Sequence, residues 1–66
     1  MTNSLKVERA RANITQQELA EILGVSRQTI NAVEKGKFNP STLLALKIAR
    51  VFNLSVNDIF FLDDNE

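Results

Sequence analysis

The sequence predicts an all-α fold built from five short helices. Apolar residues recur at helical spacing through most of the chain. Ser or Thr capping residues stand before three of the expected helices, and Gly or Asn follows the expected end of three. The helices are expected at about residues 4–12, 15–23, 26–34, 41–52 and 55–60. Because 66 residues suffice for one small domain, we expect a single domain over residues 1–66.

The composition excludes several kinds of function. The chain contains no cysteine and no histidine, so it lacks thiolate ligands, disulfides and the commonest general base. No group of carboxylates, lysines or hydroxyls stands at a catalytic spacing. No apolar run approaches the ~20 residues of a membrane span, and the N-terminus lacks a signal-peptide pattern. We therefore expect a cytoplasmic protein that is not an enzyme, needs no cofactor or metal, and has no membrane partner.

The charges are distributed unevenly, although the formal net charge is zero. All eight basic residues lie within residues 1–50 with only four acidic ones, and the other four acidic residues lie after them. The acidic tail spans residues 61–66. Ordinary surface charge and a basic DNA-binding part both explain this pattern, so it leaves the two interpretations open.

Residues 15–35 predict two short helices joined by a tight turn. Thr15 and Glu18 form a capping box, in which each side chain bonds the backbone N–H of the other residue. Gly24 suits a turn conformation that side chains resist, and Ser26 is the expected N-cap of the next helix. The apolar positions expected to face inward are Leu19, Ala20, Leu23, Ile30 and Val33. This pattern predicts a helix-turn-helix motif.

The second of these helices carries polar side chains on the face that its apolar residues leave free. Gln28 and Ala32 lie opposite Ile30, and polar residues flank them. Arg27 lies at the N-terminal end, where a recognition helix first meets bases. The pattern is typical of a helix that packs on one side and enters a groove on the other, since a protein-binding helix would carry large apolar anchors there.

The helix expected at residues 41–52 is apolar on nearly every side. A monomer of this size can hardly bury the whole apolar surface of this helix. We therefore expect part of that surface to contact another chain. Phe60 and Phe61 are adjacent and cannot point the same way, so one belongs in the core and the other is a candidate for that contact. The residues assigned to a dimer interface are Leu44, Val51, Phe60 and Phe61. We expect the tail to be extended or frayed, with strand pairing to the N-terminal residues as an alternative.

Several motifs in order resemble the Xre-type helix-turn-helix family, the phage-repressor-like DNA-binding domains. They are Thr15-Gln-Gln-Glu-Leu-Ala20, Gly24-Val-Ser26, Ile30, Glu34-Lys-Gly36, Asn39-Pro-Ser41, Leu46-Lys-Ile-Ala49 and Asp58-Ile-Phe60. Each motif is weak alone, but their order and spacing over about residues 5–60 are specific. The resemblance implies a five-helix fold that works as a homodimer on a palindromic operator. The zero net charge and the acidic tail depart from the family and predict modest non-specific affinity.

The resemblance also implies roles for individual residues. It places Gln16 at a phosphate contact, and it pairs Arg9 with Glu34 in a buried ion pair that ties the first helix to the end of the recognition helix. The residues expected to contact bases are Ser26, Arg27, Gln28, Thr29, Asn31 and Ala32. The residues expected to contact phosphates are Gln16, Gln17, Lys35, Lys37 and Asn39.

The chemistry of these side chains suits DNA. Arg27 can donate two hydrogen bonds to guanine, and Gln28 can bind adenine through its amide. Gln16 and Gln17 lie at a helix N-terminus, where free N–H groups attract phosphate. The simpler alternative for each residue is a solvated surface position, and a phosphate contact is a further alternative for Arg27.

We expect a sequence-specific transcriptional regulator. The family resemblance favours a repressor over an activator, since so small a protein has little surface left to recruit polymerase. Its partners would be double-stranded DNA and a second copy of the chain. One alternative is an antitoxin or phage-immunity regulator that also binds a partner protein. Another is a protein-interaction module without DNA binding.

Overall fold

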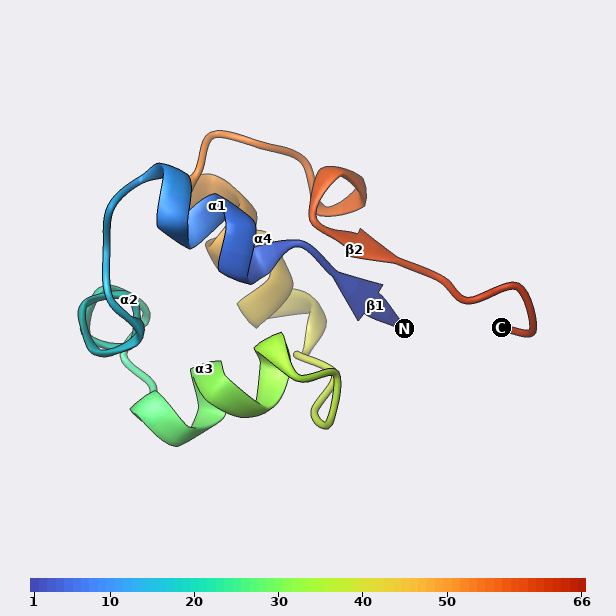
Figure 1. The fold of residues 1–66 in the computed structure, drawn as a ribbon, viewed down its shortest axis with the longest axis horizontal. Helices are drawn as coiled ribbons and strands as arrows, with labels where there is room; N and C mark the ends of the chain where they lie inside the picture. The colour runs from blue at the N-terminus through green and yellow to red at the C-terminus, as the bar shows by residue number, and fades with distance from the viewer.

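Four α-helices and a short strand pair make up the computed structural model, which describes all residues, Met1–Glu66 (Figure 1). The helices are α1 (Leu5–Arg11), α2 (Gln16–Leu23), α3 (Arg27–Glu34) and α4 (Thr42–Val51). The antiparallel strands are β1 (Thr2–Asn3) and β2 (Phe60–Phe61), and a 3₁₀ turn at Val56–Asp58 precedes β2. The mostly helical fold confirms the predicted class, but the count of five helices is wrong.

The expected fifth helix is a single 3₁₀ turn because the chain becomes extended before Phe60. The Asp58 carboxylate accepts a hydrogen bond from the Ser55 backbone N–H at 2.9 Å, and this bond holds the pKa of Asp58 below its ordinary value. Phe60 then lies opposite Asn3 in the strand pair. Pairing with the N-terminal residues, the alternative that the sequence left open, is therefore confirmed.

Capping residues set the helix boundaries. In the Thr15–Glu18 capping box, the two hydrogen bonds measure 3.0 and 2.9 Å. Ser26 and Ser41 cap α3 and α4 through their hydroxyl groups. Left-handed backbone follows α1, α2 and α4 at Asn13, Gly24 and Asn53. The N-caps predicted at Thr15 and Ser26 and the stops predicted at Asn13, Gly24 and Asn53 are confirmed, because such signals act within one helical turn.

The core consists of one apolar side of each helix and the residues after the 3₁₀ turn. Five side chains have no exposed surface: Leu5, Leu19, Ile30, Ile48 and Ile59. The other buried residues are Ala20, Leu23, Val33, Ala45, Ala49 and Phe60. All five positions expected to face inward in the helix-turn-helix are buried, which confirms the predicted spacing.

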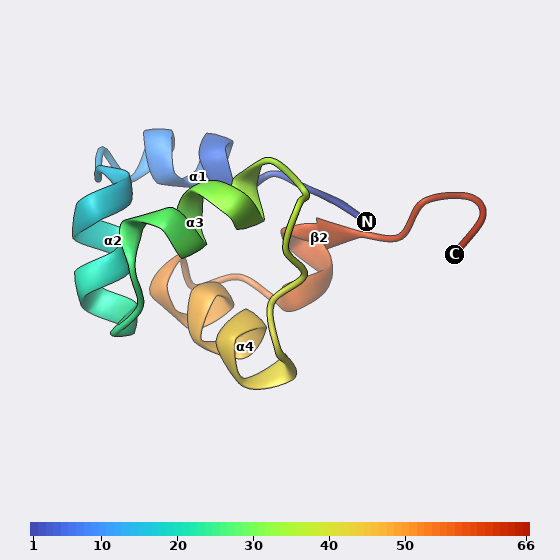
Figure 2. The ribbon, with the colours of Figure 1, turned by 90° about the horizontal axis from the view of Figure 1, so that it is seen from below.

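The arrangement leaves the outer side of α3 uncovered. Seen from below, α3 lies in front, between α1 and α4 (Figure 2). The strand pair and both termini lie at the end of the molecule opposite α2 in both views. No helix has the length and apolar character that a membrane crossing requires.

Candidate nucleic-acid interface

The outer side of α3 presents polar side chains from a well-anchored helix. Arg27 and Gln28 are exposed in its first turn, and Asn31 and Ala32 are half-buried in the next. None of the ion pairs in the chain involves Arg27. Its guanidinium is therefore available to an external acceptor.

Ser26 and Thr29 are partly committed to the start of α3. The Ser26 hydroxyl accepts a hydrogen bond from the Thr29 backbone N–H at 3.1 Å, and the two hydroxyl oxygens are 2.9 Å apart. Since a serine hydroxyl has one donor and two lone pairs, capping consumes part of its capacity. A base contact by Ser26 would have to be shared with this structural role.

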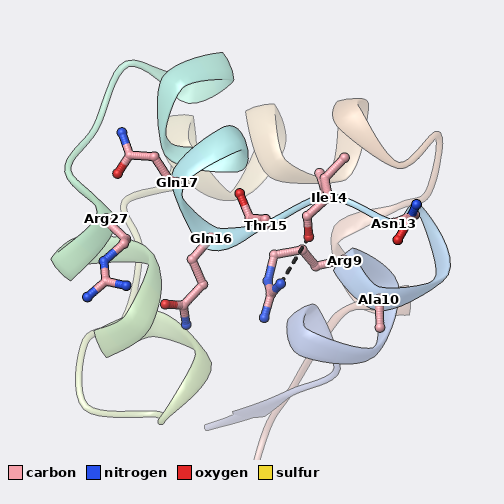
Figure 3. A pocket seen from close by; sticks show the side chains of 8 residues that line it. All are labelled: Arg9, Ala10, Asn13, Ile14, Thr15, Gln16, Gln17 and Arg27. Carbon is pink, nitrogen blue, oxygen red and sulfur yellow. Dashed lines mark hydrogen bonds between the residues drawn. The ribbon is translucent and has the colours of Figure 1, made fainter.

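A shallow hollow of about 510 Å³ lies between the end of α1, the N-terminus of α2 and the start of α3 (Figure 3). Figure 3 shows Arg9, Gln16 and Arg27 extending to the same side of it. Its other lining residues are Ala10, Asn13, Ile14, Thr15 and Gln17. The N-terminal N–H groups of α2 carry partial positive charge, so the hollow suits an anionic group such as a DNA phosphate.

Arg9 and Glu34 form a largely buried ion pair that links α1 to the end of α3. Arg9 Nε lies 2.8 Å from Glu34 Oε2, and the two side chains are 16% and 5% exposed. Arg9 Nη1 also donates to the Ile14 carbonyl at 2.9 Å, the dashed line in Figure 3. The hydrogen bonds from Arg9 to Glu34 raise the pKa of the guanidinium further, so it stays charged. The orientation of α3 therefore depends on a residue outside the helix-turn-helix.

Gln16 is engaged inside the protein. Its Nε2 donates to Glu34 Oε1 at 3.0 Å and to Asn31 Oδ1 at 3.2 Å. A side-chain amide has only two N–H donors, and a phosphate can only accept. The side chain of Gln16 has no donor left for a phosphate in this arrangement, which leaves its backbone N–H for that contact. No sequence signal predicted the contact between Gln16 and Asn31.

The other phosphate candidates lie on the surface. Gln17 is exposed and donates to Glu21 at 3.1 Å. Lys35, Lys37 and Asn39 are exposed in the loop after α3. Lys35 shares a shallow hollow with Asp63 of the acidic tail. The tail thus brings negative charge close to one of the expected phosphate contacts.

The Asp63 carboxylate is itself paired. It lies 2.9 Å from the Met1 amino group, and Glu66 lies at the same distance. The hydrogen bonds that this amine donates, to Glu66 first and to Asp63 second, raise its pKa. The tail is therefore held against the N-terminal strand.

An apolar surface lies apart from the polar side of α3. We define the α4 surface as Ile22, Leu43 and Leu46, which are 59%, 63% and 53% exposed. Two adjacent hollows run between the end of α2 and α4, and both are lined by Leu23 and Lys47. Leu43 and Leu46 lie one turn apart on α4, and Ile22 lines one of the two hollows beside that helix.

The four residues that the sequence assigned to a dimer interface do not lie on one surface of the structure. Leu44 and Val51 are half-buried against the core. Phe60 is only 7% exposed and belongs to the core, so its assignment to an interface was wrong. Phe61 is 43% exposed but lies in the strand pair rather than in the α4 surface.

The joined pair α2–α3, with a free polar face on the second helix, defines a helix-turn-helix domain. The model of the helix-turn-helix family matches residues 5–59. The chain therefore belongs to this family, which comprises DNA-binding transcription regulators and is not enzymatic.

Relatives from archaea, bacteria and a phage match most or all of the chain. It is 56% identical over 66 residues to an uncharacterized HTH-type transcriptional regulator of Methanocaldococcus jannaschii, over the whole of both chains. It is 47% identical over 64 residues to the HTH-type transcriptional regulator YgzD of Bacillus subtilis, over 97% of each chain. It is 36% identical over 53 residues to the ImmF control region 10 kDa protein of Bacillus phage phi105, covering 80% of this chain and 59% of that protein.

A solved structure shares the fold. The hypothetical transcription factor NHTF from Neisseria superposes with a TM-score of 0.73 at 24% sequence identity. The match covers 82% of this chain and 62% of that chain.

Proposed function

We propose that the protein is a transcriptional repressor that binds a palindromic operator as a homodimer in the cytoplasm. The observation that carries this proposal is the outer side of α3, where Arg27 and Gln28 are exposed on a helix that is capped, packed and held by an ion pair. It acts as a single domain over residues 1–66, since the buried residues of all four helices form one cluster.

In the proposed complex, α3 enters the major groove. Arg27 binds guanine O6 and N7, Gln28 binds adenine, and the Ala32 methyl contacts a thymine methyl. Ser26, Thr29 and Asn31 complete the base contacts. Phosphates are bound by the α2 N-terminus at Gln16 and Gln17 and by the loop residues Lys35, Lys37 and Asn39.

The second copy of the chain covers the α4 surface. Its three apolar side chains are each more than half exposed, and Leu44 and Val51 line the two hollows beside it. A symmetric dimer would place two copies of α3 in successive major grooves, about 34 Å apart. Occupancy of an operator that overlaps a promoter would then block polymerase.

A second candidate is a phage-immunity regulator that also binds a partner protein. The similarity to the control-region protein of phage phi105 favours it. In this case the α4 surface would bind that partner in place of a second copy.

The experiment that tests the proposal is selection of bound sequences from a random DNA pool with the full chain. A palindromic consensus is expected, with half-sites about one helical turn apart and with affinity that falls as salt rises. Light scattering of the complex should give two chains per operator. A consensus without symmetry would refute the homodimer mechanism, and no consensus at all would refute sequence-specific binding.

A further inference from the structure

We propose that Arg9, Glu34 and Gln16 form a hydrogen-bond relay that fixes the orientation of the Asn31 amide and thereby its base preference. Gln16 acts as a positioning residue, and Asn31 offers only its Nδ2 donors to the groove. The assignment of Asn31 to a base rests on the proposed function, whereas the relay itself belongs to the free protein.

The fixed end of the relay is the Glu34 carboxylate. It is only 5% exposed, and Arg9 Nε holds one of its oxygens at 2.8 Å. Arg9 is itself held by the Ile14 carbonyl at 2.9 Å. An ionised carboxylate can only accept hydrogen bonds, so any group that meets Glu34 Oε1 must be a donor.

This requirement sets the orientation of Gln16. The atom of its amide that lies 3.0 Å from Glu34 Oε1 is Nε2. The opposite orientation would bring two oxygens together with no proton between them. The second hydrogen of Nε2 points to Asn31, so the atom of Asn31 that meets it at 3.2 Å must be the acceptor Oδ1.

The orientation of Asn31 follows. Its Oδ1 faces Gln16, and its Nδ2 makes no hydrogen bond within the chain. Asn31 lies one turn after Gln28 on the side of α3 that carries Arg27. An asparagine usually binds adenine through both ends of its amide. That contact would require Oδ1 to turn away from Gln16 and toward the groove.

A donor without an accompanying acceptor selects certain base edges. In the major groove, guanine presents O6 and N7, adenine presents N7, and thymine presents O4, whereas cytosine presents only a donor. We therefore infer that Asn31 favours guanine at the base it meets and disfavours cytosine. The preference depends on Gln16, which contacts no base.

The first test measures the relay without DNA. In the free protein, the side-chain amide hydrogens of Gln16 should exchange with solvent more slowly than those of Gln17, because Gln16 uses both hydrogens in partly buried bonds and Gln17 is exposed. Nuclear magnetic resonance of both amides provides this comparison within one molecule. Equal exchange rates would overturn the relay.

The second test measures base preference in the full chain. Gln16→Met removes the donor at similar length, and we expect the preference at the Asn31 base to weaken by about fivefold while the other positions of the consensus are unchanged. Asn31→Asp keeps an acceptor toward Gln16 and turns a second oxygen to the groove, so the preference should move to cytosine or adenine, whose edges donate. Asn57→Asp makes the same chemical change at an exposed residue outside the relay and outside the proposed interface, and should leave the preference at the Asn31 base as in the wild type.

The outcomes separate the two proposals. If the wild type selects no sequence, the proposed function fails, and the assignment of Asn31 to a base fails with it. If the wild type selects a sequence and Gln16→Met keeps the same preference at every position, the relay is overturned while the proposed function stands. Melting temperatures of all variants show whether each one is folded in the binding assay. A merely structural role of Gln16 would weaken binding to every sequence alike and would leave the base preference unchanged.

Discussion

Helices α3 and α4 are built in the same way and differ in what they expose. Each is capped by a serine hydroxyl that accepts from a backbone N–H at 3.1 Å, and each buries one apolar stripe. On the outer side α3 exposes Arg27 and Gln28, whereas α4 exposes Leu43 and Leu46. The shared features explain why both segments are helices, and the difference indicates which partner each would meet.

The two helices are also held differently. The Arg9–Glu34 ion pair links α3 to α1, whereas no ion pair links α4 to the rest of the chain. Removing a charge of the Arg9–Glu34 ion pair should therefore destabilise the fold, whereas a substitution of an exposed apolar residue on α4 should alter only association. The following four predictions test this difference.

Arg9→Ala should have the largest effect. It leaves the nearly buried Glu34 carboxylate without its cation, which typically costs roughly 3–5 kcal/mol of folding free energy. In a domain of this size each kcal/mol lowers the melting temperature by about 4–8 °C, so DNA binding should be lost together with the fold. Circular dichroism during thermal and urea unfolding measures the loss.

The control for Arg9→Ala is Arg11→Ala. Arg11 is 73% exposed and pairs with Glu8 at 3.2 Å, so its removal should change the stability by less than about 0.5 kcal/mol. Equal melting temperatures for the two variants would mean that the ion pair does not anchor α3.

Leu46→Glu should separate the proposed dimer and leave the fold intact. Leu46 is 53% exposed, so its replacement costs the monomer little. Two like charges facing each other across an interface should weaken self-association by about a hundredfold, which sedimentation equilibrium measures. Leu62→Glu, at a side chain 75% exposed in the tail, should leave association unchanged. A dimer as tight as the wild type would exclude the α4 surface as the interface.

Arg27→Ala should spare the fold and weaken operator binding by about 1–3 kcal/mol, with relaxed preference at one base. The side chain takes part in no ion pair, so unfolding should be unaffected. Fluorescence anisotropy with the selected operator measures the affinity. Arg50→Ala removes an exposed cation from α4 and should bind almost as the wild type does. If Arg27→Ala bound as tightly as Arg50→Ala, Arg27 would not contact the operator.

The smallest effects are expected for Ser26→Ala and Ser41→Ala. These two variants compare α3 with α4 directly, because each removes the same kind of N-cap bond from one of the helices. Each removes one N-cap hydrogen bond, which typically costs about 1 kcal/mol. Both variants should therefore unfold at similarly reduced urea concentrations. Only Ser26→Ala should weaken DNA binding when affinity is measured well below the melting temperature. Equal affinities would show that the start of α3 is not at the DNA.

Local features of the sequence predicted most of the helical structure. Capping boxes, left-handed stops and apolar spacing act within one or two turns, so the ends of α2 and α3 and all five of their inward positions were predicted. The prediction of a fifth helix was wrong because residues 55–60 are too few to be stable as a helix alone. Their conformation depends on strand pairing with the other end of the chain.

The sequence by itself also determined which side chains α3 exposes, because helical spacing fixes the inward positions and leaves the rest outside. Only the tertiary structure decided that Phe60 belongs to the core and that Gln16 turns inward to Glu34 and Asn31. An amide can form hydrogen bonds with water or with several protein groups, and an aromatic ring can be buried against several apolar surfaces. Which one it meets depends on how α1, α2 and α3 are brought together, and that is a property of no single segment.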